Sequence, residues 1–68
     1  MQALREFRIE RGMSQAQIAE RVGCTPSHVS LVETGKRQPS IATLRRLSEA
    51  LRIEPGRLLV GPRVGAER

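Results

Sequence analysis

The segment from Gln15 to Val32 constrains the fold more than any other part of the chain. Apolar residues at helical spacing stand on both sides of Gly23, which predicts two short helices joined by a tight turn. Because the helices are joined so closely, one outer face of the second stays free, as in units that enter the major groove of DNA. The residues expected to hold the two helices from inside are Ile18, Ala19 and Val22 in the first and Val29 and Val32 in the second.

The length and composition narrow the classes of function. A chain of 68 residues forms one domain at most, with room for four or five short helices around a small core. A large pocket with an assembled catalytic site does not fit this size, and the chain has no aspartate, one histidine and one cysteine. Phe7 is the only aromatic residue, so a platform for stacking single-stranded bases is absent. These features argue against an enzyme and against a single-strand binder.

The charge balance favours a polyanionic partner. The formal net charge is +5, from 12 basic and 7 acidic side chains. The phosphate backbone of DNA is the commonest partner of such a surplus. The charge alone is equally compatible with a soluble protein that happens to be basic.

Cysteine and histidine usage predicts neither a disulfide nor a metal or cofactor site. Cys24 has no second cysteine to pair with, and Cys24 with His28 supplies only two of the four ligands of a structural zinc site. We therefore interpret Cys24 as a small core residue beside the turn. The chain also lacks a long apolar run, which predicts no membrane span or signal peptide and a cytoplasmic location.

Capping signals divide the chain into helices. The first is expected from about residue 2 to Arg11, ended by Gly12. Ser14 and Gln17 form a capping-box pattern for a second helix that ends at Gly23. Thr25 followed by proline predicts a sharp start for a third helix that continues to about residue 33.

The remaining residues predict two further helices and a tail. Ser40 is expected to cap a fourth helix, and Pro55 to open a short fifth one. The domain is therefore expected to span residues 1–60, and residues 61–68, which lack a periodic pattern, are expected to form a flexible tail. The apolar positions of the fourth helix are Ile41, Leu44, Leu47 and Leu51, and most of its arginines at 45, 46 and 52, on its polar side, are expected to be solvated.

The outward face of the third helix is the candidate base-reading surface. At about 100° per residue, the side opposite the two valines is short and mostly uncharged, which suits close approach to base edges. Leu31 could contact a thymine methyl or be an ordinary exposed leucine. His28 lies on a flank, as a groove contact or a plain surface histidine. The predicted base-facing residues are Ser27, His28, Ser30 and Leu31.

Helix N-termini and loop cations are the candidate phosphate contacts, because their amides and charges attract anions. Gln15 stands at one such helix start, where it could bridge a phosphate and the start of the third helix. Lys36 and Arg37 follow the third helix, although two adjacent cations are also common in solvated loops. The predicted phosphate contacts are Gln15, Thr25, Thr34, Lys36, Arg37 and Ser40.

Over about residues 2 to 60, the chain resembles the phage-repressor and Cro-type helix-turn-helix family, also called XRE-like, in the order of its residues. The run from Arg8 to Gln15 carries much of the resemblance, together with Ala19, Val22-Gly23, Val29-Ser30, Val32-Glu33, Gly35-Lys36, Pro39-Ser40, Leu44, Leu47 and Leu51. The chain departs from common family patterns at Leu31, where a polar or basic residue is frequent, and at Pro26. Base preference is therefore not carried over from any relative.

The resemblance implies an all-α, compact five-helix, lambda-repressor-like domain that binds operator DNA as a two-fold dimer and regulates transcription. It also implies that the residue matching Gln15 holds a phosphate, that those matching Thr34 and Lys36 lie near the DNA backbone, and that Arg8 pairs with Glu33. From the sequence we expect a repressor that binds a palindromic operator as a homodimer. The alternative is an antitoxin-like module that binds a partner protein and DNA only secondarily.

The dimer surface is the least constrained part of this interpretation. The apolar residues near the end of the last helix could form a small self-complementary patch between two copies. They could equally close the core of one copy. The residues concerned are Leu58, Leu59 and Val60.

Overall fold

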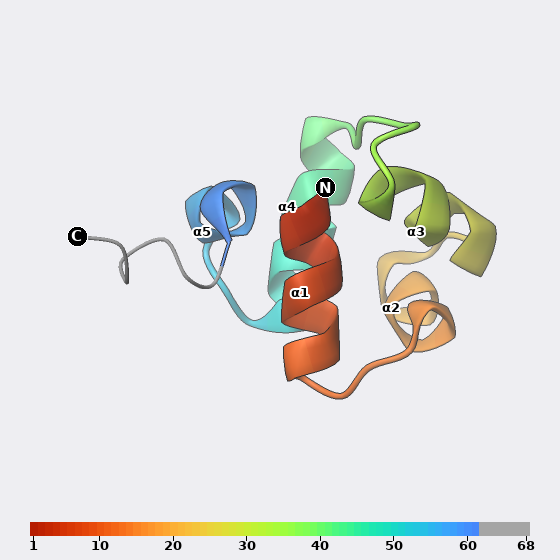
Figure 1. Cartoon of the computed structure of the whole chain (residues 1–68), viewed down its shortest axis with the longest axis horizontal. Helices are drawn as coiled ribbons and strands as arrows, with labels where there is room; N and C mark the ends of the chain where they lie inside the picture. Colours follow the sequence, from red (N-terminus) through yellow and green to blue (C-terminus); the bar gives the residue numbers. More distant parts are fainter. Residues whose placement is uncertain (62–68) are drawn as a thin grey trace.

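The computed structural model describes residues 1–61, which form five α-helices and no strand. Helix α1 is Gln2–Glu10, α2 is Gln15–Val22, α3 is Pro26–Glu33, α4 is Ile41–Leu51 and α5 is Pro55–Val60. In Figure 1, α1 stands in front of α4, with α2 and α3 on one side and α5 on the other. The all-α, five-helix expectation is confirmed, and the first helix ends one residue earlier than expected.

Side-chain caps set where three of the helices begin. The Ser14 hydroxyl accepts from the backbone N–H of Gln17 at 3.0 Å, while the Gln17 side chain accepts from the Ser14 N–H at 2.8 Å. Thr25 accepts from the His28 N–H at 3.1 Å at the start of α3. Ser40 does the same at the start of α4. These bonds satisfy amides that the first turn of a helix leaves without a partner, so the predicted starts are confirmed.

The first four helices end in one shared backbone motif. After each, a residue in the left-handed conformation turns the chain, and the next amide bonds back into the last turn. Glycine occupies that position three times, as Gly12, Gly23 and Gly35, with φ of 67°, 87° and 82°. After α4 the position belongs to Arg52, with φ of 59°. Its amide donates to Glu49, and that of Ile53 donates to Ser48.

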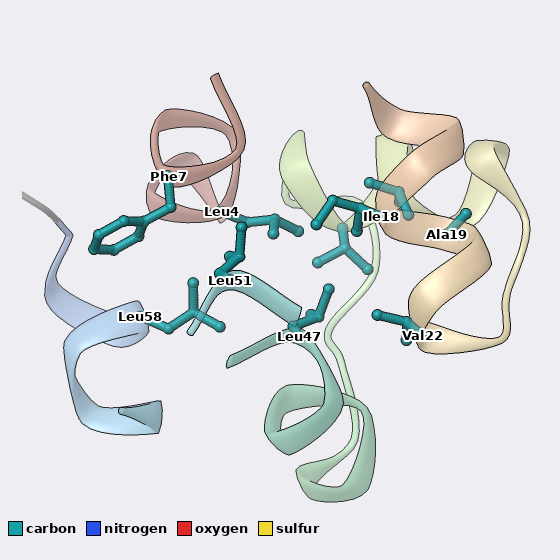
Figure 2. Packing of buried hydrophobic residues seen from close by; sticks show 10 residues of the cluster. Leu4, Phe7, Ile18, Ala19, Val22, Leu47, Leu51 and Leu58 are labelled. Carbon is teal, nitrogen blue, oxygen red and sulfur yellow. The ribbon is translucent and has the colours of Figure 1, made fainter. Parts of the chain in front are cut away.

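The core is aliphatic around one phenylalanine and joins all five helices. Figure 2 shows Phe7 and Leu58 at one end and Val22 at the other, with Leu4, Leu47 and Leu51 between them. Ala19, whose small side chain lies in α2, is 1% exposed. The buried apolar residues are Leu4, Phe7, Ile18, Ala19, Val22, Val29, Val32, Leu47, Leu51 and Leu58. Cys24 is only partly buried and packs against this cluster.

Helix α4 differs from its predicted apolar stripe at its first residue. Ile41 is 75% exposed, and Leu44 is half-buried, whereas Leu47 and Leu51 lie in the core. The first turn of α4 extends past the N-terminal end of α1 (Figure 1), so α1 does not cover it. The inward assignment of Ile41 was therefore wrong. The helical spacing was right, but it could not show where the core ends.

The exposure of residues 58–60 distinguishes the two interpretations of the last helix, a patch between two copies or a part of the core. Leu58 has no exposed surface and belongs to the core, so it cannot contribute area to an interface between copies. Leu59 and Val60 are 64% and 56% exposed, and the candidate dimer patch reduces to these two residues. Gly61 is buried close to Ala3 of α1. The rest of the expected tail, 62–68, lies outside the described residues.

Two further expectations concern membranes and metals. None of the helices in residues 1–61 has both the length and the apolar character needed to cross a bilayer. The same residues contain no group of three or more side chains that could hold a metal ion.

Candidate nucleic-acid interface

Helix α3 presents two different faces. Val29 and Val32 are each 1% exposed and fix its inward side against the core. Ser27 and Leu31 are exposed on the other side. The orientation deduced from the spacing of the two valines is therefore the observed one. The outer face is free among the described residues, at the edge of the molecule away from α5 (Figure 1).

The four predicted base-facing residues are not equally open. Leu31 is 36% exposed and Ser27 is exposed, so both project from the helix. Ser30 and His28 are half-buried, because each lies beside Val29 at the border between the two faces. We call these four residues the recognition face. Its centre is Ser27 and Leu31, with the other two on its flanks.

A buried carboxylate fixes the end of α3. The Glu33 side chain is 3% exposed, and Arg8 of α1 contacts it twice, with Nε donating to Oε2 at 2.6 Å and Nη2 donating to Oε1 at 3.2 Å. The third nitrogen of Arg8, Nη1, donates to the carbonyl of Met13 at 2.9 Å. The guanidinium therefore ties α1, the loop before α2, and α3 together. Planar, charge-assisted pairs of this kind hold a fixed geometry.

Gln15 joins the same network. Its Nε2 donates to Oε1 of Glu33 at 3.1 Å. We expected it to reach the start of α3, and it reaches the end instead. The tight turn at Gly23 places the end of α2 beside the start of α3, so the start of α2 lies near the far end of α3. The backbone amides of the first turn of α2 remain available as anion donors beside it.

Three predicted phosphate contacts have hydroxyl groups already engaged. Thr34 donates to the carbonyls of Ser30 and Leu31 at 3.0 and 3.2 Å, which closes the last turn of α3. Ser40 donates to the Thr43 hydroxyl at 3.0 Å. Thr25 uses its oxygen as a cap acceptor. Phosphate binding at the starts of α3 and α4 would therefore rely largely on backbone amides.

The loop between α3 and α4 carries the nearby cations. Lys36 and Arg37 are exposed and make no ion pair within residues 1–61. Their backbone amides both donate to the carbonyl of Leu31, at 2.9 and 3.2 Å, so the start of the loop is fixed against α3. Two unpaired charges therefore lie next to the recognition face.

Sequence reasoning missed one residue of this surface. Ile41 stands directly after the cap residue Ser40, and it is largely exposed. An aliphatic side chain there could pack on a deoxyribose. Its position one residue after an N-cap was the available signal, since first-turn residues often extend past the core.

Comparisons with known proteins agree with this geometry. The family model described as Helix-turn-helix matches residues 4–58. An HTH-type transcriptional regulator of Methanothermobacter thermautotrophicus is 40% identical over 48 residues, which cover 71% of this chain and 70% of that protein. Two HTH-type transcriptional regulators of Sinorhizobium fredii, y4dL and y4dJ, are 38% and 35% identical over 53 and 47 residues.

The matches to the two Sinorhizobium proteins cover most of this chain but a smaller part of each relative. The matched residues cover 78% and 69% of this chain, but only 27% of y4dL and 61% of y4dJ. No solved structure gave a significant match. The family model covers most of the chain, including all of α2 and α3. The chain thus belongs to the helix-turn-helix family of DNA-binding, non-enzymatic transcriptional regulators.

Proposed function

We propose that this chain binds a specific double-stranded DNA sequence as a homodimer and represses transcription by occupying a promoter. The observation that carries the proposal is the orientation of α3. Val29 and Val32 are 1% exposed, and the side chains of Ser27 and Leu31 are free on the opposite side. Hydroxyl groups and an aliphatic side chain are suited to base edges and to the thymine methyl.

Affinity would come mainly from phosphate contacts around the recognition face. Candidates are the Lys36 and Arg37 side chains, the Gln15 amide and the first-turn amides of α2 and α4. With roughly 6–10 contacts in a dimer, affinity should fall by about 10³–10⁵ between 50 and 200 mM salt. The buried Glu33 would act indirectly, by fixing where Gln15 stands.

A two-fold dimer would place two copies of α3 in successive major grooves, about 34 Å apart. Leu59 and Val60 supply the candidate patch, on the opposite side of α1 from α3 (Figure 1). A two-fold axis through this patch would make the two copies read the DNA in opposite directions. Such an arrangement predicts a palindromic site.

The test selects duplexes from a random pool with the purified chain and sequences them. The expected result is an enriched site with two-fold symmetry. Affinity for that site is then measured for Leu31→Glu and Gln15→Ala. Ile9→Glu is the matched control, because Ile9 is another exposed aliphatic residue, 53% exposed, on α1.

We expect at least about tenfold weaker binding for Leu31→Glu, because a carboxylate would face the DNA backbone, and little change for Ile9→Glu. No enriched site at low salt would contradict DNA recognition and favour the antitoxin-like alternative, in which a partner protein is the main ligand. An enriched site without symmetry would contradict the homodimer alone. Equal losses for Leu31→Glu and Ile9→Glu would contradict the assigned face.

A further inference from the structure

A basic hollow lies where α1, α2 and α4 end. Arg21 of α2 and Arg46 of α4 line it together with Glu49, Ala50 and Arg52, around a volume of about 400 Å³. An adjoining hollow of about 250 Å³ shares Arg21, Ala50 and Arg52 with it. The second hollow also reaches Arg11, Met13 and Leu51. Together they form an open trough, which we call the arginine trough.

Most charges of the trough are not neutralised by ion pairs among the residues that the structure describes. Among residues 1–61, Arg21, Arg46 and Arg52 make no ion pair. Arg11 differs, because its Nε donates to the carbonyl of Leu51 and its Nη1 contacts Glu10. Within residues 1–61, Glu49 is the one carboxylate that lines the trough. Three free guanidinium groups therefore converge on one concave surface.

The backbone at Arg52 adds a second, independent observation. Its φ of 59° and ψ of 46° are left-handed, a conformation that is unfavourable for a residue with a Cβ. At the ends of α1, α2 and α3 glycine fills the equivalent position. An arginine in this place carries a conformational cost that glycine would avoid. Its side chain lines both hollows, so binding of a ligand there would offset this conformational cost.

Interaction with helix dipoles explains only part of the cluster. Arg21 lies in the last turn of α2, and Arg52 directly follows α4, where positive charge is favourable. Arg46 lies in the middle of α4, where the dipole has little effect. Dipole stabilisation also does not explain why arginine stands at the left-handed position.

The trough lies away from the predicted phosphate contacts at the starts of α2 and α4. Gln15 and Ser40 lie at the starts of α2 and α4, whereas the trough lies at their ends. At 1.5 Å per residue, Arg21 is about 9 Å beyond Gln15 along α2, and Arg52 is about 18 Å beyond Ser40 along α4. A duplex bound to α3 would therefore leave the end of the trough at Arg52 accessible to another ligand.

We propose that the arginine trough binds an extended acidic segment of a partner polypeptide. Guanidinium groups bind carboxylates through paired hydrogen bonds, and three of them would hold two or three acidic side chains. Glu49 would accept from a backbone N–H of the bound segment. A phosphodiester chain has no such donor to offer Glu49. The two adjoining hollows, of about 400 and 250 Å³, offer more room than a single small anion needs.

The test uses the whole chain and a fluorescein-labelled decapeptide of alternating glutamate and glycine, in which binding is followed by anisotropy. A decapeptide with glutamine in place of glutamate is the control ligand. We expect saturable binding of the acidic peptide only. Its affinity should fall about threefold to fivefold for Arg46→Gln, the range of one exposed charge pair. The matched control is Arg45→Gln, which changes the same charge on the neighbouring exposed residue outside the trough.

Arg52→Gly separates binding from folding. Glycine suits the left-handed backbone, so the variant should melt at the same or a higher temperature while it binds the peptide at least threefold more weakly. In amide NMR spectra of the unaltered chain, the peptide should shift residues 21–22 and 46–53 and leave α3 unchanged. Equal losses for Arg45→Gln and Arg46→Gln, or shifts centred on α3, would overturn the proposal. Displacement of the peptide by non-specific duplex DNA would also overturn it, because the trough would then be a nucleic-acid surface.

Discussion

The inner and outer faces of α3 show how one short helix serves two purposes. Inside, Val29, Val32 and Glu33 are 1%, 1% and 6% exposed, and each has a defined partner in the core or the buried network. Outside, Ser27 and Leu31 contact solvent. The inner residues determine where the helix lies, whereas the outer ones are free to vary without affecting the fold. A substitution should therefore change either stability or DNA recognition, according to the face it alters.

The largest expected effect comes from Glu33→Ala. Removal of the carboxylate leaves the Arg8 guanidinium, in a side chain that is only 13% exposed, without its charged partner. Breaking a buried pair in this way costs about 3–5 kcal/mol. A domain of this size has about 3–10 kcal/mol of total stability. Urea unfolding followed by circular dichroism should therefore show a chain that is largely unfolded without urea, or that unfolds at a much lower urea concentration than the unaltered chain.

A paired replacement tests why Glu33→Ala is so costly. In the double variant Arg8→Met, Glu33→Leu no charge is left unpaired, so most of the lost stability should return. A loss below about 1 kcal/mol for Glu33→Ala alone would show that the pair is effectively solvated. The inner and outer faces of α3 would then differ less in their contribution to stability than the structure indicates.

The next effect belongs to the inner valines. Val32→Ala removes two methyl groups from a fully packed site and should lower the free energy of unfolding by about 2 kcal/mol. Val60→Ala makes the same chemical change at a residue that is 56% exposed, and should cost less than about 0.5 kcal/mol. Thermal unfolding at low protein concentration measures both. Similar losses would mean that Val60 is covered in solution, as it would be in a dimer.

The turn between the two helices ranks third. Gly23 has a φ of 87°, and a Cβ added there would meet no atom within 4 Å, so the cost of Gly23→Ala is purely conformational. We expect a loss of about 1–2 kcal/mol. Gly56 has equal space but lies inside α5 with an ordinary backbone, and Gly56→Ala should stabilise the chain by about 0.5–1 kcal/mol. Opposite signs in denaturant unfolding would confirm the distinction, and equal signs would contradict it.

The helix ends and the orientation of α3 could be predicted from the sequence because they depend on local features, whereas the Arg8–Glu33 pair was implied only by the family resemblance. Ser14, Thr25 and Gly23 mark the ends of helices through hydrogen bonds made within a few residues of themselves. The spacing of the two valines gave the orientation of α3 for the same reason. Local rules therefore sufficed for the five helices and for the face that α3 presents.

What the sequence did not predict depends on contacts between distant segments. The exposure of Ile41 and the burial of Leu58 depend on how the helices pack against one another. The bond from Gln15 to Glu33 needs the packed arrangement of α2 and α3. The arginine trough brings together residues of α2 and α4 with the residues that follow α1, an association that no single helix pattern shows.

The smallest effect on stability, and the sharpest one on recognition, is expected from Leu31→Ala. Because Leu31 faces outward, its truncation should change the free energy of unfolding by less than about 0.5 kcal/mol. If its side chain contacts a thymine methyl, the preference for thymine at one position of the selected site should fall about fivefold. The base preferences at the other positions should not change. Replacement of that thymine by uracil, which lacks the methyl, should weaken the unaltered chain by a similar factor and leave Leu31→Ala unaffected. Losses that simply multiply in the combined experiment would show that Leu31 and the methyl do not touch, and would limit the outer face to its serines and His28.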